Sequence, residues 1–338
     1  MLGDVDGYSN DFRNLVGSAG IPAASDPGGL GFADPPVHTR LRHLLTPEFT
    51  LRRLTRLAPR IDAIVAQRLD AMTQARGPVD LVQAFARPIP AQVICELLGV
   101  PYEDRGGFQQ WRTTRYDLGG GADASLGAMS RSLADLRTVI EQQRTSSGDG
   151  LLGMIITEHG DQVDDHELVG LADGVLTGGF ETTASMLALG ARILLQDPAA
   201  FRLMHDDDAS IIPLVEELLR YLSVVQSAFP RFARHDQQLA GSAIARGDMV
   251  VCSLSGANRD EDLGTGMDSF TPTGILPRTW PSATVCIGAE LARMELRAAY
   301  PALVRRVPAM RLYVDPNTLV YPQTSLVDGV DSLPVLLR

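Results

Sequence analysis

Apolar residues recur at three- and four-residue spacing through most of the chain, the pattern of helices with one buried face. Seven stretches show it clearly, and each predicts a helix: residues 60–72, 90–100, 130–144, 165–176, 182–196, 211–222 and 288–307. Strand-like runs are few and short, at 248–254 and 311–314, and glycine and proline clusters at 18–36 and 117–123 predict loops. The pattern predicts a single, mainly α domain over residues 1–338 with a minor β part.

Composition narrows the class of protein. The net charge of −11 argues against a nucleic-acid partner, and no apolar run is long enough to span a bilayer. The three cysteines, Cys95, Cys252 and Cys286, are far apart and odd in number, which suits a reducing compartment and excludes a disulfide framework. We therefore expect a cytoplasmic protein with neither a nucleic acid nor a membrane as partner.

One histidine and one arginine lie near the start of a predicted helix that follows a proline pair. His38 and Arg42 follow Pro35-Pro36 and stand four residues apart, on one helix face. Such a pair of donors could hold two carboxylates, or it could be an ordinary solvated face.

The sequence "TGGFETTASML" (177–187) places two glycines, an acid and two threonines inside an apolar helix. Gly178 and Gly179 cost the helix about 1–2 kcal/mol relative to alanine. One interpretation is a close helix crossing that needs small residues. The other is a widened turn beside a ligand, with Glu181 and Thr182 relaying protons.

Two further features are weak when taken alone. Glu217 and Arg220 have the i, i+3 spacing of a helix salt bridge, and their apolar flanks predict burial. Cys286 precedes a predicted helix, where a thiolate is stabilised and can bind metal, and Gly288 leaves space for a flat group. A buried structural cysteine is the alternative.

Taken in order, these segments resemble the cytochrome P-450 family of the soluble bacterial type. The segments "HTRLR", "GGFETT", "EELLR", "FPRFAR…GANRD" and "CIGAELARMELR" follow the family's order and approximate spacing over essentially the whole chain. The resemblance implies the triangular helical fold of that family and bound haem b.

The resemblance also implies roles for individual residues. Cys286 would be the axial thiolate of the haem iron, and His38, Arg42 and Arg231 would bind the haem propionates. Glu181 and Thr182 match the acid–alcohol pair that manages protons for oxygen, whereas Glu217 and Arg220 match a structural ion pair.

The chain departs from the family in two places. "GYSNDFRNL" (7–15) resembles the segment just after the family's second helix, so we expect most of the small β-rich portion to be missing. The second departure is the approach to Cys286. The family has a glycine-bearing loop whose N–H groups face the sulfur, but Pro277 and Pro281 supply no N–H here.

A shifted reading frame explains the second departure. When residues 273–285 are written in GC-rich codons and one G is restored in front, the product is D-R-D-P-A-P-H-L-A-F-G-H-G, the missing family loop. We hypothesise that a one-base loss, compensated near Cys286, put this loop out of frame. About three residues before the cysteine are also absent relative to the family.

Two functions follow from the resemblance. The first is a haem-thiolate monooxygenase that hydroxylates or epoxidises a small apolar organic molecule and receives electrons from a ferredoxin or a similar donor. The second is a haem-free, inactive member of the same fold that serves as a helper, for example of a glycosyltransferase.

Overall fold

The computed structural model describes residues 3–11, 29–31, 33–100, 122–227, 230–273, 286–323 and 325–338, with the backbone alone at 122–126, 128 and 129. The 273–285 loop, apart from Thr273, and most of the predicted loops at 18–36 and 117–123 lie outside these residues. Among the helices of the described part, none is both long and apolar enough to cross a membrane.

Helices make up most of the described chain. They are α2 (Val37–Leu45), α3 (Leu51–Leu54), η2 (Thr55–Leu57), α4 (Ala58–Thr73), η3 (Val82–Ala86, a π-helix), α5 (Pro88–Leu98), α7 (Ala122–Thr145), α8 (Leu151–His159), α9 (Asp165–Gln196), α10 (Pro198–Asp206), α11 (Asp208–Leu222), α12 (Leu254–Ala257), η6 (Glu261–Leu263), α14 (Ala289–Arg306) and η7 (Pro316–Thr318).

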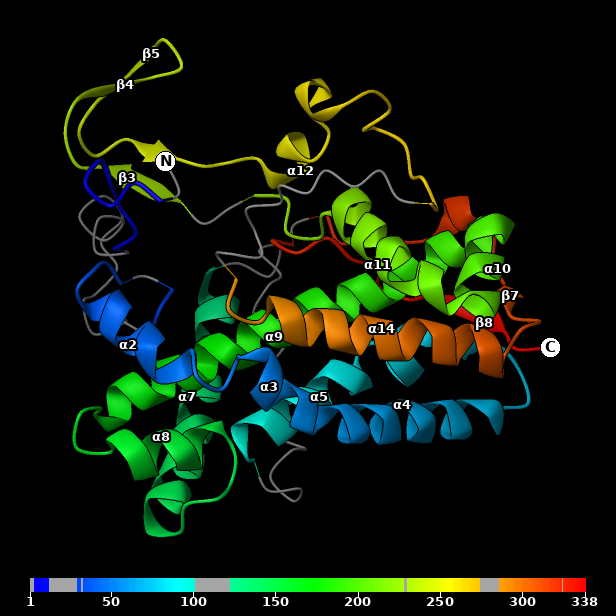
Figure 1. Cartoon of the computed structure of the whole chain (residues 1–338), viewed down its shortest axis with the longest axis horizontal. Coiled ribbons are helices and arrows are strands. Elements are labelled where there is room, and N and C mark those ends of the chain that lie inside the picture. The colour runs from blue at the N-terminus through cyan, green and yellow to red at the C-terminus, as the bar shows by residue number, and fades with distance from the viewer. Residues whose placement is uncertain are drawn as a thin grey trace.

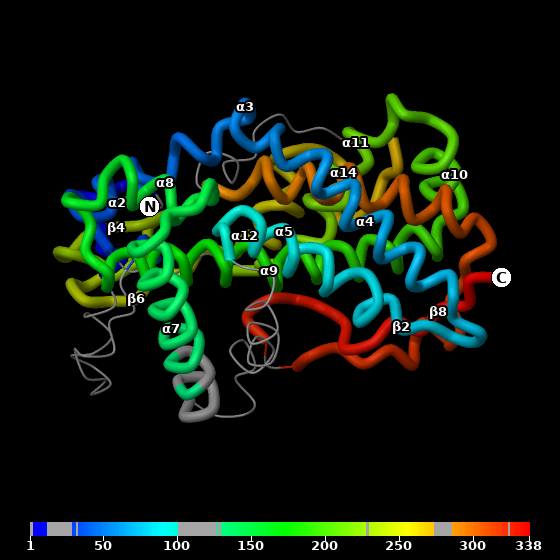
Figure 2. The backbone as a smooth tube through the Cα atoms, turned by 90° about the horizontal axis from the view of Figure 1, so that it is seen from below, coloured from blue at the N-terminus to red at the C-terminus, as the bar shows by residue number. Residues whose placement is uncertain are grey.

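The strands are two or three residues long and form three small antiparallel sheets. They are β1 (Tyr8–Ser9), β2 (Val79–Asp80), β3 (Arg231–Ala233), β4 (Gln237–Leu239), β5 (Ser242–Ile244), β6 (Met249–Val250), β7 (Arg311–Leu312) and β8 (Pro334–Leu336). The β1-β3-β6 sheet lies at one end of the molecule and the β2-β8-β7 sheet at the other (Figures 1 and 2).

Helix α9 runs along the length of the molecule, α5 and α14 pack against it, and α4 packs on both of these helices (Figures 1 and 2). It begins with a capping box, in which the Asp164 carboxylate accepts from the Glu167 N–H at 2.8 Å and the Glu167 carboxylate accepts from the Asp164 N–H. Between Leu168 and Leu194 most of its side chains are buried. A helix that buries side chains over so much of its length is expected at the centre of a core.

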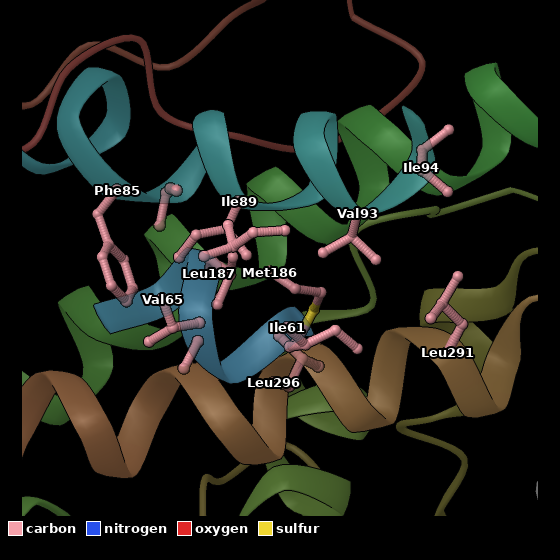
Figure 3. Close-up of a cluster of buried hydrophobic side chains, with 14 of the residues drawn as sticks. Ile61, Val65, Phe85, Ile89, Val93, Ile94, Met186, Leu187, Leu291 and Leu296 are labelled. Atoms are coloured by element: carbon pink, nitrogen blue, oxygen red, sulfur yellow. The ribbon is translucent and has the colours of Figure 1, made fainter. Parts of the chain in front are cut away.

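The core lies where α4, α5, α9 and α14 meet. Figure 3 shows side chains of these four helices packed together with Phe85 of η3; the others labelled are Ile61, Val65, Ile89, Val93, Ile94, Met186, Leu187, Leu291 and Leu296. The predicted mainly α architecture with a minor β part is therefore confirmed.

Tyr300 of α14 fixes the approach of this helix to α9. Its hydroxyl donates to the Met186 carbonyl, and complete burial raises the pKa of the phenol, which keeps it a neutral donor. A β-carbon on Gly190 would overlap the same hydroxyl. Gly190 is therefore the residue that lets Tyr300 reach the α9 backbone.

Gly190→Ala is expected to lower the free energy of unfolding by about 1–3 kcal/mol, because the added methyl group overpacks the helix contact. Gly174→Ala is the matched control in the same helix, since a β-carbon there meets no atom within 4 Å. That variant should gain about 0.5–1 kcal/mol in the haem-free protein from helix propensity alone. Urea titration followed by circular dichroism measures both; equal effects of the two changes would contradict this account of the contact.

Candidate functional site

Two segments almost 200 residues apart bring the predicted cationic residues together. His38 and Arg42 are half-buried on α2, next to the buried Leu41 and Leu45, each of which follows one of them by three residues. Burial lowers the pKa of His38, and the positive charges of Arg42 and Arg231 lower it further, against the raising effect of Asp34. Arg231 on β3 is therefore close enough to act on the imidazole, and the three donors form one electropositive cradle.

The glycine–threonine stretch lies at the middle of α9, and the helix is continuous through it. The Thr182 hydroxyl donates to the Gly178 carbonyl at 2.6 Å, which is the back-bonding that the sequence predicts. The widened turn, one of the two interpretations of this stretch, is absent from this described helix. A carbonyl oxygen has two lone pairs, so the Gly178 oxygen can accept the hydroxyl while the helix stays closed.

The two adjacent glycines have different surroundings. A β-carbon on Gly179 would overlap the Ile94 side chain of α5, so this glycine serves the close helix crossing. A β-carbon on Gly178 would meet no atom within 4 Å, and Gly178 is exposed. The open side of α9 therefore carries Gly178, with Glu181 and Thr182 half-buried one turn further on.

Cys286 precedes α14, which begins at Ala289 with Gly288 as its N-cap. Its side chain is exposed, whereas Cys95 is buried and Cys252 is half-buried. A β-carbon on Gly288 would meet no atom within 4 Å. α14 packs against α9, and its start lies near the middle of α9 in both views (Figures 1 and 2).

Glu217 and Arg220 form a buried bidentate ion pair on α11, with both N–O distances 2.7 Å. Arg220 also donates to the carbonyls of Asn258, Met267 and Ser269, and Glu217 accepts from the Thr271 N–H at 2.9 Å. The pair therefore fixes the segment 258–271, which leads toward the cysteine, onto α11.

Sequence reasoning missed a second ion-pair network beside the first. Glu216 accepts two hydrogen bonds from Arg293 at 2.7 and 2.9 Å and one from Arg297 at 3.2 Å. Burial acts to raise the pKa of Glu216, but the two arginines outweigh it and hold the pKa below its usual value. The only signal available was the doubled acid in "VEELLR".

Arg293 connects this network to the cysteine. Its hydrogen bond to Glu216 raises the pKa of Arg293 against the effect of burial, and the nearby Glu290 and Cys286 act in the same direction. α11 and the first turns of α14 are thereby held together next to the thiol.

Comparisons with known proteins identify the family of the chain. The family model described as Cytochrome P450 matches residues 130–274, and its end falls at the start of the 273–285 stretch. Cytochrome P450 165B3 of Amycolatopsis orientalis is 40% identical over 349 residues, 99% of this chain and 86% of that protein. This chain belongs to the cytochrome P450 family.

Two further P450 comparisons extend the likeness. Vitamin D(3) 25-hydroxylase of Pseudonocardia autotrophica is 38% identical over 97% of this chain and 83% of its own length. OxyC, a P450 implicated in an oxidative C–C coupling reaction during vancomycin biosynthesis, superposes with a TM-score of 0.85 at 37% identity, covering 99% of this chain and 83% of that one. By this resemblance the chain is a P450-type monooxygenase, and its family implies a haem-thiolate iron cofactor.

The described residues fit such a cofactor. The cradle of His38, Arg42 and Arg231 suits an acidic group. The positive charges of Arg42 and Arg231, which lower the pKa of His38, would attract the negative charge of that group. Gly178 and Gly288 leave free the space that a β-carbon would occupy. The exposed Cys286 sulfur offers the single thiolate ligand of this haem class.

Proposed function

We propose that this chain is a haem-thiolate monooxygenase that hydroxylates or epoxidises a small apolar organic molecule in bacterial secondary metabolism. The observation that carries the proposal is membership of the P450 family, with 40% identity over 99% of the chain to Cytochrome P450 165B3. The exposed Cys286 before α14, the open space at Gly178 and the cationic cradle support it.

Haem b is the cofactor in this proposal. Cys286 would bind its iron, His38, Arg42 and Arg231 its propionates, and Gly178 and Gly288 would leave room for the flat ring. When bound, the haem supplies the activation of dioxygen, and thiolate ligation favours O–O cleavage. Gly179, which packs against Ile94, is assigned to the helix crossing and not to the cofactor.

Thr182 and Glu181 would manage protons at the open side of α9. The Thr182 proton is directed to the Gly178 carbonyl, so the lone pairs of Oγ1 remain to accept a hydrogen bond from a second donor. The Glu181 side chain is half-buried, and its carboxyl is the acid of the pair. Together they provide an acid and an alcohol on adjacent residues.

The electron donor in this proposal is a ferredoxin or a similar small redox protein. Arg52, Arg56 and Arg60 lie exposed on α3, η2 and the first turn of α4, although the chain as a whole is acidic. Arg56 and Arg60 are ion-paired with Glu48 and Glu96, so an acidic partner would meet these arginines with part of their charge already compensated.

Gly178→Ala tests the proposal because its two expected effects have opposite signs. In the haem-free chain the variant should be more stable by about 0.5–1 kcal/mol, since alanine favours the helix and nothing lies within 4 Å of its methyl group. Haemin should bind about tenfold more weakly, because the methyl group fills space that the ring needs. Urea titration and absorbance titration with haemin measure the two effects.

Gly127→Ala in α7 is the matched control. Its β-carbon would make an ordinary 3.6 Å contact with Arg131, so it should gain helix stability without any change in haemin affinity. Unchanged haemin binding by Gly178→Ala would argue against the placement of the cofactor on this side of α9.

A further inference from the structure

Strand register places Asn10 directly opposite Arg231. β1 pairs with β3 antiparallel, with Ser9 opposite Phe232, so the next residue along β1 faces Arg231. Opposite residues of an antiparallel pair project to the same side of the sheet. The Arg231 Nη1 donates to the Asn10 Oδ1 at 2.5 Å, which shows that the two side chains meet.

The Asn10 amide is held in one orientation by its other contacts. Its Nδ2 donates to the Gly31 carbonyl at 2.6 Å, and its backbone N–H donates to the Asp34 carboxylate at 2.7 Å. Because the amide nitrogen is engaged with a carbonyl, the amide oxygen is the atom directed at Arg231.

The nearby carboxylate is engaged elsewhere. Asp34 accepts from the Ser9 hydroxyl at 2.5 Å and from the Arg234 guanidinium at 2.6 Å, in addition to the Asn10 N–H. Arg234 therefore forms the ion pair with this acid. Burial lowers the pKa of Arg231, and the charge of Asp34 acts on that pKa in the opposite direction. Arg231 donates to two neutral oxygens, those of the Asn10 amide and, at 3.3 Å, the carbonyl of the preceding residue. A neutral acceptor fixes the direction of a guanidinium and leaves its charge in place.

We infer that Asn10 is a positioning residue, which orients Arg231 toward an anionic group of the cofactor without neutralising it. The inference rests on the proposed function for the identity of that anion, a haem propionate. A carboxylate at position 10 would form an ion pair with Arg231 and compete with the propionate.

The test uses the full chain and two probes, haemin and haemin dimethyl ester, which lacks the propionate charges. Asn10→Asp should weaken haemin binding at least tenfold, on the scale of one charge-assisted hydrogen bond, and should change ester binding less than twofold. Asn317→Asp is the matched control, because this exposed residue of η7 undergoes the same change in charge. Equal losses for both probes, or no loss for either, would overturn the inference.

A second readout does not depend on haem. In the haem-free chain, NMR titration of His38 reports the Arg231 charge, which lowers the pKa of that imidazole. Asn10→Ala should raise the pKa of His38 by releasing Arg231, and Asn10→Asp should raise it further by adding a negative charge. Failure of wild-type chain to bind haemin would count against the proposed function alone, whereas an unchanged His38 titration in both variants would overturn the role of Asn10.

Discussion

Glu217→Ala is expected to lower the free energy of unfolding by about 3–5 kcal/mol, the cost of leaving one member of a buried ion pair without its partner. The side chain of Arg220 is only 6% exposed, and that of Glu217 only 1%. Removal of the carboxylate also takes the acceptor of the Thr271 N–H. Denaturant unfolding, followed by circular dichroism at several wavelengths, measures the loss and checks that the transition is two-state.

Glu158→Ala provides the control for this change. Glu158 lies exposed on α8, so its removal should alter stability by no more than about 0.5 kcal/mol. The description of Glu217 and Arg220 as the connection between α11 and segment 258–271 would be wrong if Glu217→Ala cost less than about 1 kcal/mol.

Replacement of residues 273–285 by D-R-D-P-A-P-H-L-A-F-G-H-G is expected to tighten haemin binding at least tenfold, about 1.4 kcal/mol. The glycine-bearing loop offers backbone N–H groups to the thiolate. Pro277 and Pro281 of the present sequence have no backbone N–H to offer. Absorbance titration of the two chains with haemin measures the difference.

The control is the chain with a scrambled loop of the same composition, which should bind haemin no more tightly than the unaltered chain. If the restored loop gave no gain over the scrambled one, the frame-shift hypothesis would lose its physical rationale. Resequencing of the gene tests the hypothesis directly, since an intact family loop in the DNA would mark the present reading as an error.

Long periodic helices were predictable because their apolar faces leave a signal over several turns. The stretches 165–176 and 182–196 are both helical, and the structure joins them into α9 across the glycines. The short helices α8 and α10 were not predicted. The strands were mostly missed, because two-residue strands such as β1 depend on a partner more than 220 residues away, and only β6 and β7 fall within predicted runs.

The candidate site shows the same division between local and distant signals. The spacing of His38 and Arg42 gave their shared face, but only the fold reveals which of two adjacent glycines faces open space. Likewise, Glu216 and Glu217 are adjacent in sequence and turn to different arginines, because side chains one residue apart on a helix diverge by about 100°. Asn10 carried no recognisable signal, since its role depends on the register of β1 against β3.

The most direct test of the central claim is the ferrous–CO absorption spectrum of this chain, expressed as written and supplied with haemin, beside Cys286→Ala. The account predicts a strongly red-shifted Soret band, the signature of thiolate ligation, that is lost in the variant. A folded, helical chain that takes up no haem would contradict the account. It would favour the alternative function, that of a haem-free helper protein. The same band in both proteins would exclude Cys286 as the ligand.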